Sequence, residues 1–326
     1  MKILFMGTPD FALFSLRAMV ESGEEIIGVV TQPDQPKGRG YVLTPPPVKV
    51  YAMEHGLKVY QPETLRDDAF FELLGKLSPE LIVVTAYGKI LPERVLNYPK
   101  YGCVNVHGSL LPQYRGAAPM QRAIMEGNKV TGVTTMMMDK GLDTGDILLK
   151  GEIAIEENDN FETVHDKMGE CSSEVLIRTL EAIRCGTLQR TKQNSDLATY
   201  AAKIEKTDCV LDFSRSAAEL HDQIRGLSPF PLAFTRTPDG KMLKVTAAEV
   251  AEKTGNAAFA GTVLSLDGGK VTVACGEGKL ALLAVLPEGK GRMTAAAWIN
   301  GRKIQVGDVF MTPSDMTANG SNTNPR

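Results

Sequence analysis

The alternation of short apolar runs with helical segments constrains the fold of this chain more than any other feature. Apolar runs at residues 2–6, 26–30, 58–60 and 81–85 alternate with segments at 11–20, 48–55 and 69–77 that favour helices. The run at 81–85, LIVVT, is apolar and β-branched, which is typical of a strand buried on both faces. The alternation therefore predicts a doubly wound, mostly parallel, Rossmann-like α/β sheet.

The pattern changes after residue 186, where a polar stretch precedes short strands of alternating polarity. These strands, expected near residues 241–249, 261–266, 270–274 and 279–285, are typical of a small OB-like β-barrel. With 326 residues the chain can form two cores. We expect a first domain at residues 1–189, a linker at 190–206, a barrel domain at 207–313 and a disordered tail at 314–326.

Cysteine usage and charge narrow the class of protein. The five cysteines are odd in number and scattered, without a CxxC pair or a histidine cluster at zinc spacing. They predict reduced thiols in a cytoplasmic protein without a metal site. The N-terminal apolar run is too short for a signal peptide or a membrane span. A net charge of -3 gives no overall attraction for polyanions, so a nucleic acid would need a local basic patch.

Asn105 and His107 are the first candidates for a reaction centre. They are one residue apart at the end of an apolar strand, so the pleat points both side chains to one face. Ligands of open α/β sheets bind at the carboxyl ends of strands. A hydrogen-bonded structural histidine is the simpler interpretation, but its pairing with Asn105 favours a functional one.

Two loops add further candidates. The segment GSLLPQYRGAAP is expected to expose Leu110 and Leu111, either to pack on the next helix or to contact a flat apolar ligand. In KGLDTGDIL, Asp143 and Asp146 are both suited to an Asx-turn, and their spacing does not choose between them.

The long loop at residues 32–47 carries Lys37 and Arg39 among prolines and glycines. Such a loop is long for an α/β connection and is often functional. It is either a surface excursion or, as we favour, a contact for an anionic partner.

Four segments together resemble the methionyl-tRNA formyltransferase family: FMGTPDFA, TQPDQPKGRG, NVHGSLLPQYRGAAPMQRAIMEG and GLDTGDIL. The resemblance extends from residue 1 to about residue 313. It implies 10-formyltetrahydrofolate as co-substrate and Asn105, His107 and Asp143, rather than Asp146, as catalytic residues. It also implies that folate contacts Ser109, Leu110, Leu111 and Pro112, with Tyr87, Gly88 and Ile90 on the pteridine side.

These residue types suit formyl transfer to an amine. The donors Asn105 and His107 can stabilise the oxyanion that develops on the formyl oxygen. Asp143 can orient the imidazole and accept the proton of the attacking amine. An α-amino group has an unperturbed pKa of about 7.7 to 8.0, so the substrate supplies its own nucleophile and neither a metal nor a Ser or Cys nucleophile is needed.

Methionyl initiator tRNA is the acceptor that the sequence favours over glycinamide ribonucleotide, an amino sugar nucleotide or water. The turn GTPDFA lacks a glycine-rich phosphate cradle, the Lys37 and Arg39 loop resembles the family element placed against the acceptor stem, and a barrel follows. The candidate tRNA contacts are Lys37, Arg39, Lys203, Lys206, Lys290, Arg292, Arg302 and Lys303. The last four are alternatively a solvated basic face. We expect a monomer without membrane contact.

Two other classes of protein compete with this assignment. A nicotinamide-dependent oxidoreductase would carry GxGxxG after the first strand, where Gly7 stands alone. A tRNA-binding module without catalysis would not need the set of Asn105, His107 and Asp143.

Overall fold

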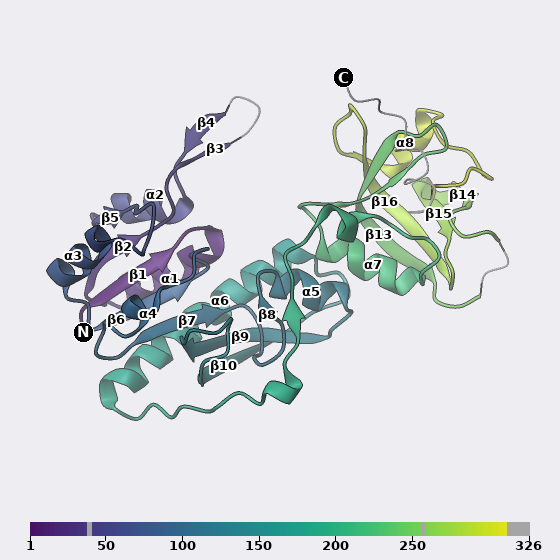
Figure 1. The fold of residues 1–326 in the computed structure, drawn as a ribbon. Coiled ribbons are helices and arrows are strands. Elements are labelled where there is room, and N and C mark those ends of the chain that lie inside the picture. The colour runs from purple at the N-terminus through teal and green to yellow at the C-terminus, as the bar shows by residue number, and fades with distance from the viewer. Residues whose placement is uncertain (38–40, 256–257, 312–326) are drawn as a thin grey trace, which may run out of the picture. The chain divides into compact units, whose positions relative to one another are not determined.

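The computed structural model describes residues 1–37, 41–255 and 258–311 (Figure 1). The chain forms two compact units. The first comprises Met1–Pro119, Val130–Ala154 and His165–Ala202, and the second comprises Met120–Lys129, Ile155–Val164 and the chain from Lys203 onward. The predicted tail at 314–326 lies outside the described residues. The predicted domain boundaries stay a prediction.

The first unit is built on a seven-stranded sheet with the order β10-β9-β7-β6-β1-β2-β5. Five strands are parallel, namely β1 (Ile3–Gly7), β2 (Ile26–Val30), β5 (Val59–Tyr60), β6 (Leu81–Thr85) and β7 (Cys103–His107). Two antiparallel strands complete the edge, β9 (Val130–Met137) and β10 (Ile147–Ala154). The prediction of a mostly parallel Rossmann-like sheet is confirmed.

Helices pack on both faces of this sheet. On one face, Phe70 and Leu74 of α3 (Asp68–Leu77) belong to the same buried cluster as Ile82 and Val84 of β6. On the other face, the Thr85 hydroxyl of β6 donates to Ser15 of α1 (Asp10–Glu21) at 3.0 Å. Because successive strand residues point to opposite faces, these contacts place α3 and α1 on opposite sides of the sheet.

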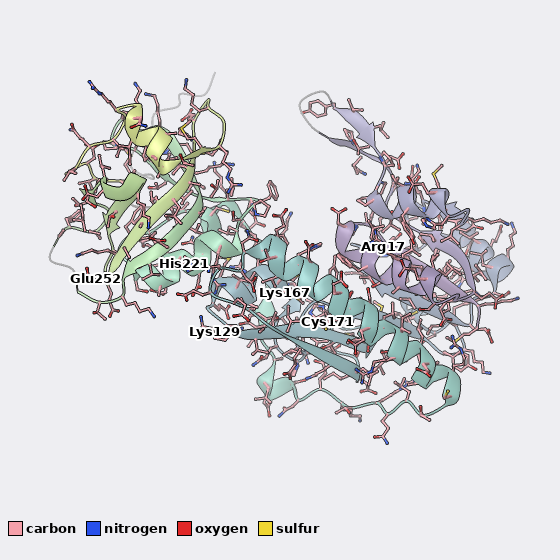
Figure 2. All side chains as sticks on the ribbon, turned by 180° about the vertical axis from the view of Figure 1, so that it is seen from behind. Arg17, Lys129, Lys167, Cys171, His221 and Glu252 are labelled. Carbon is pink, nitrogen blue, oxygen red and sulfur yellow. The ribbon has the colours of Figure 1, made fainter. Side chains whose placement is uncertain are left out.

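The long helix α6 (Phe161–Cys185) covers the antiparallel edge of the sheet. Its Thr179 exchanges a 2.8 Å hydrogen bond with Thr135 of β9. Its Cys171, labelled in Figure 2, lies so close to Gly151 of β10 that a Cβ at that position would overlap the sulfur. Glycine at 151 therefore allows the helix to approach the sheet closely. The remaining helices of this unit include α2 (Pro47–Glu54), α4 (Glu93–Leu96) and the start of α5 (Pro119–Met125).

The long loop at residues 32–47 contains a short hairpin that the sequence did not predict. It is formed by β3 (Gln35–Lys37) and β4 (Val42–Thr44). Three side chains hold its base together: Lys49 Nζ lies 2.8 Å from the Asp34 carboxylate, and Gln61 Nε2 lies 2.7 Å from the same group. The hydrogen bond from Gln61, followed by that from Lys49, lowers the pKa of Asp34. The loop is thus anchored to the body of the first unit.

The second unit contains an antiparallel sheet with the order β12-β13-β16-β15-β14 and with β17 beside β16. All four strands predicted from the sequence are present. The strands are β12 (Ala233–Arg236), β13 (Met242–Glu252), β14 (Val263–Ser265), β15 (Val271–Ala274), β16 (Lys279–Pro287) and β17 (Met293–Thr294). The OB-like closure of this sheet stays a prediction.

The sequence did not predict two helices of the second unit. Helix α7 (Ala217–Gly226) begins at a capping box in which Ser216 and Glu219 satisfy each other's backbone amides. Its Leu220 and Ile224 are buried in the same cluster as Trp298 of α8 (Ala295–Asn300). These helices complete the core of the second unit. In the part of the chain that the structure describes, no helix is long and apolar enough to span a membrane.

Candidate active site

Asn105 and His107 lie at the carboxyl end of β7, a central strand between β6 and β9. Their separation by one residue points both side chains to one face of the sheet, as the sequence predicts. His107 is buried, with 6% of its side chain exposed, and Asn105 is half-buried. Within the described residues the Asn105 carboxamide forms no hydrogen bond, so it can donate to a ligand.

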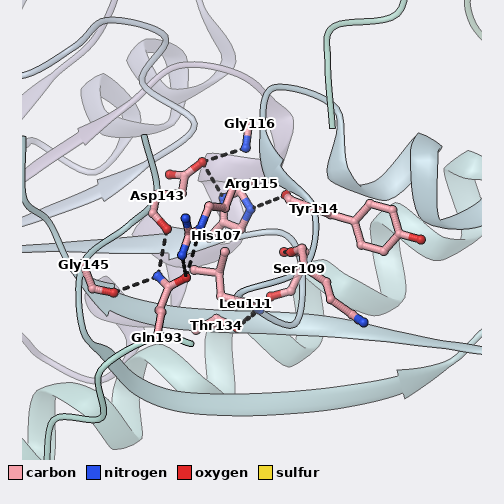
Figure 3. Close-up of polar contacts among 11 residues, drawn as sticks. His107, Ser109, Leu111, Tyr114, Arg115, Gly116, Thr134, Asp143, Gly145 and Gln193 are labelled. Carbon is pink, nitrogen blue, oxygen red and sulfur yellow. Dashed lines mark hydrogen bonds and ion pairs between the residues drawn. The ribbon is translucent and has the colours of Figure 1, made fainter. Parts of the chain in front are cut away.

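Both ring nitrogens of His107 face oxygen atoms (Figure 3). Nε2 lies 2.9 Å from the backbone carbonyl of Tyr114, and Nδ1 lies 3.7 Å from Oδ2 of Asp143. Because a carbonyl oxygen can only accept, Nε2 carries a hydrogen at this contact. Asp143 is the carboxylate that faces the imidazole, whereas Asp146 contributes its backbone oxygen to the Met137 amide.

The backbone of Asp143 has an uncommon conformation with φ of 52°. In this left-handed conformation its Oδ2 accepts a 2.8 Å hydrogen bond from the Gly116 amide. Its own carbonyl accepts a 2.8 Å hydrogen bond from Nε2 of Gln193. Asp tolerates the left-handed region better than most residues, yet such backbone persists only where its surroundings hold it.

The residues that hold Asp143 in place include part of segment 190–206, which was predicted to be a linker. Strand β11 (Tyr200–Ala201) pairs in parallel with β8 (Arg115–Gly116), and the Tyr114 amide donates to the Thr199 hydroxyl at 2.8 Å. Gly116 has φ of 116°, and a Cβ there would lie 2.8 Å from the Ala201 carbonyl oxygen. Two-residue strands have no periodic sequence signature, which is why these contacts could not be predicted.

The candidate folate-binding loop is more buried than the sequence suggested. The expectation that Leu110 and Leu111 are both exposed is wrong, because Leu111 is fully buried and Leu110 is half-buried. The Thr134 hydroxyl of β9 causes this by accepting from the Leu111 amide at 3.1 Å and donating to the Ser109 carbonyl at 2.7 Å. Ser109 is itself fully buried and donates to the Gln113 carbonyl at 2.6 Å, and Pro112 is half-buried.

The other folate candidates follow β6. Tyr87 is only 2% exposed, and its hydroxyl is buried without a hydrogen-bond partner among the described residues. Burial raises the pKa of Tyr87 to about 12. Gly88 has φ of 86°, which favours glycine. Ile90 is 80% exposed and lines a cavity of about 260 Å³ whose other lining residues are Glu63, Thr64, Leu65, Arg66 and Lys89.

The candidate tRNA contacts fall in both units. Lys37 ends β3, and Arg39 lies outside the described residues. The others are all exposed: Lys203 and Lys206 near the start of the last segment of the second unit, Lys290 and Arg292 between β16 and β17, and Arg302 and Lys303 just after α8. None of these six side chains forms an ion pair with a carboxylate among the described residues, so no described carboxylate neutralises their charges.

Thiol catalysis and metal binding are two other kinds of site chemistry. The five cysteines are free, and burial raises the pKa of Cys103, two residues before Asn105, to about 12. Such a thiol is a poor nucleophile. Across the described ranges no three His, Cys, Asp or Glu side chains are grouped so that they could hold a metal ion.

Family models match both parts of the chain. A model described as "Formyl transferase" matches residues 1–180, and a model described as "Formyl transferase, C-terminal domain" matches residues 203–303. The class of protein that the fold and the candidate site define is therefore a formyl transferase.

Curated relatives narrow the class. A methionyl-tRNA formyltransferase of Caldanaerobacter subterraneus is 47% identical over 311 residues, which cover 95% of this chain and 100% of the relative. A methionyl-tRNA formyltransferase of Bacillus subtilis is 46% identical over 311 residues, which cover 95% and 97%. The chain belongs to the methionyl-tRNA formyltransferase family.

Solved structures share the fold at lower identity. The N-formyltransferase from Helicobacter canadensis, in complex with folinic acid and dTDP-3-aminofucose, has a TM-score of 0.64 at 17% identity and covers 86% of this chain and 98% of its own. HypX from Aquifex aeolicus in complex with tetrahydrofolic acid has a TM-score of 0.60 at 18% identity and covers 93% and 47%. These likenesses support the fold.

Proposed function

We propose that this protein transfers the formyl group of 10-formyltetrahydrofolate to the free α-amino group of methionyl initiator tRNA. The product, formylmethionyl-tRNA, would serve translation initiation in the cytoplasm. The observation that carries the proposal is the 47% identity, over 95% of the chain, to a relative named methionyl-tRNA formyltransferase. The pairing of His107 with Asp143 beside an Asn105 amide that has no partner among the described residues supports it at the level of chemistry.

The reaction forms one bond and breaks another at the formyl carbon. The α-amino nitrogen attacks this carbon and an oxyanion develops on the formyl oxygen. In the proposed mechanism the Asn105 amide, which has no partner among the described residues, is the donor available to stabilise that oxyanion. His107 can add a second donor only when its Nε2–H leaves the Tyr114 carbonyl. When the oxyanion collapses, the bond from the formyl carbon to N10 of the folate breaks and the new amide remains.

The proton balance assigns a role to Asp143. The α-amino nitrogen attacks as a neutral amine, becomes ammonium-like once the new bond forms and then loses a proton, and N10 of the departing tetrahydrofolate gains one. The Asp143 carboxylate, 15% exposed, can take the first proton directly or through water while it keeps His107 oriented. The hydrogen bond from the Gly116 amide leaves the other carboxylate oxygen, Oδ1, without a partner among the described residues.

The folate would contact Ser109, Leu110, Leu111 and Pro112, with Tyr87, Gly88 and Ile90 on the pteridine side. Ile90 supports this role best, because it is 80% exposed and lines a cavity. Ser109 and Leu111 are fully buried, so we assign contacts in this loop to its backbone and to Leu110 and Pro112.

The tRNA would be held mainly by phosphate contacts. The exposed cations Lys203, Lys206, Lys290, Arg292, Arg302 and Lys303 have no described carboxylate partner. Lys37 ends β3 of the hairpin whose base is held by Asp34, Lys49 and Gln61. Arg39 lies outside the described residues and is proposed from the sequence alone. Contacts of this kind position a nucleic acid without reading its sequence. We further propose that the second unit closes as an OB-like barrel and that the protein acts as a monomer.

An acceptor competition tests the proposal directly. The purified protein is incubated with 10-formyltetrahydrofolate and one of three acceptors: methionyl initiator tRNA, glycinamide ribonucleotide or dTDP-3-aminofucose. We expect formylation of the charged tRNA alone, detected as acid-stable formylmethionine. Formylation of either small acceptor at a higher kcat/KM would overturn the assignment of the acceptor, and no transfer to any of them would overturn the activity.

A further inference from the structure

The side chain of Gln193 bridges two parts of the candidate active site that are far apart in the sequence. Its Nε2 lies 2.8 Å from the carbonyl oxygen of Asp143 and 2.8 Å from that of Gly145. Its Oε1 accepts from Arg115, at 3.1 Å from Nε and 2.8 Å from Nη2 (Figure 3). All four contacts lie within the first unit.

The partners fix the orientation of the Gln193 carboxamide. A guanidinium group can only donate, and a backbone carbonyl can only accept. Only one of the two orientations of the amide therefore satisfies all four contacts. Arg115 is 3% exposed and has no carboxylate partner among the described residues, so its buried charge depends on the Gln193 oxygen.

Nε2 of Gln193 binds the backbone carbonyls of Asp143, the catalytic candidate, and of Gly145, which are the residues on either side of Thr144. Holding both of them fixes the turn in which Asp143 has φ of 52°. That backbone conformation directs its carboxylate to the Gly116 amide and to Nδ1 of His107. Without the bridge, nothing among the described side-chain contacts holds the Asp143 carbonyl.

We propose that Gln193 is a positioning residue for formyl transfer, acting through Asp143, and that Arg115 orients its amide. This inference rests on the proposed function. In this proposal Gln193 does not contact either substrate. It sets where the Asp143 carboxylate lies relative to His107, and a displacement of about 1 Å in such a group can lower a rate by about 10²-fold.

Two substitutions separate the donor half of the bridge from the acceptor half. Gln193→Glu keeps the oxygen that accepts from Arg115 but turns a second oxygen toward the Asp143 and Gly145 carbonyls, which repel it. Gln193→Met keeps the length of the side chain and loses both halves. The matched control is Asn194→Asp, which makes the same change of amide to carboxylate one residue later and keeps the oxygen that accepts from the Asp196 amide.

Kinetics and NMR of the full chain provide the readouts. We expect Gln193→Glu and Gln193→Met to lower kcat by about 10²-fold, with both KM values unchanged, while Asn194→Asp behaves as wild type. The chain has four histidines, so the ¹⁵N resonances of its imidazoles are few, and those of His107 are assigned by their loss in His107→Gln. We expect these resonances to shift in both Gln193 variants and to stay in place in Asn194→Asp.

The outcomes distinguish this inference from the function on which it rests. A wild-type protein that formylates no acceptor overturns the proposed function, while the His107 resonances still test the positioning. If wild type is active and both Gln193 variants retain its kcat, the positioning role is wrong. It is also wrong if kcat falls while the His107 resonances do not move, because Gln193 then acts by another route.

Discussion

At the scale of single residues, the proposed reaction centre includes a carboxylate that the backbone presents in an unusual conformation. Asp143 faces His107, and Asp146, three residues later, does not contact the imidazole. The sequence alone suits either residue to an Asx-turn, and the family resemblance selects Asp143. Its geometry supplies a physical reason for that selection, because the Asp143 carboxylate also accepts the Gly116 amide.

The first prediction compares these two aspartates. Asp143→Asn keeps an oxygen for the Gly116 amide but removes the charge and the ability to accept a proton, so we expect kcat to fall by about 10²- to 10⁴-fold. Asp146→Asn, the matched control, should leave kcat unchanged. Steady-state formylation of methionyl initiator tRNA measures both. Equal losses in the two variants would mean that Asp143 has no special role.

His107 provides a second prediction at this scale. We expect His107→Ala to lower formyl transfer by orders of magnitude while tRNA binding stays nearly intact, because the ring is buried at the proposed reaction centre and is not among the exposed cations proposed to bind tRNA. Rapid-quench kinetics give the first quantity, and a filter-binding titration gives the second. Near-normal turnover would remove His107 from the mechanism.

The buried hydroxyl of Tyr87 allows a prediction about stability. It has no described partner and is cut off from water, so Tyr87→Phe removes an unsatisfied polar group. We expect the free energy of unfolding to rise by about 1 kcal/mol, measured by urea denaturation. Tyr98→Phe is the control, since Tyr98 is 38% exposed. A loss of stability in Tyr87→Phe would show that the hydroxyl is hydrogen-bonded after all.

At the scale of elements, strongly periodic segments were predictable and short pairings were not. The strands at 81–85 and 279–285 lie within a residue or two of their predicted limits, because buried runs of this length leave a clear pattern. The strands β3, β4, β8 and β11 have only two or three residues each, too few for a periodic pattern, and β8 and β11 in addition pair across more than 80 residues of sequence. Gln193 belongs to the second kind, since its role is set entirely by tertiary contacts.

The base of the hairpin supports a pH prediction. The hydrogen bonds from Gln61 and Lys49 lower the folded-state pKa of Asp34, so this carboxylate stabilises the fold above its unfolded pKa of about 3.9 and loses that contribution as pH falls through the folded pKa. We expect Asp34→Asn to lower the Tm at neutral pH. The difference in Tm from wild type should shrink below about pH 4. A difference that stays constant between neutral and acid pH would contradict the role of the Asp34 charge.

At the scale of the whole molecule, the net charge of -3 means that attraction for tRNA has to come from local surface. We propose that four cations that flank α8 in the sequence, namely Lys290, Arg292, Arg302 and Lys303, provide such a surface in the second unit. They are exposed and have no described carboxylate partner. The chemistry and the local electrostatic attraction therefore belong, in our proposal, largely to different units of one chain.

The salt dependence of tRNA binding tests this division. Each phosphate contact releases counterions, so Lys303→Ser should weaken binding and reduce the slope of log Kd against log salt by roughly 1. Lys253→Ser is the matched control, because Lys253 is also exposed but lies just past β13, away from the four cations in sequence. With saturating tRNA, kcat should stay at the wild-type value in both variants, because neither lysine belongs to the reaction centre. If Lys303→Ser leaves the slope unchanged, or if Lys253→Ser changes it equally, the cations that flank α8 do not bind tRNA and the attraction must arise elsewhere in the chain.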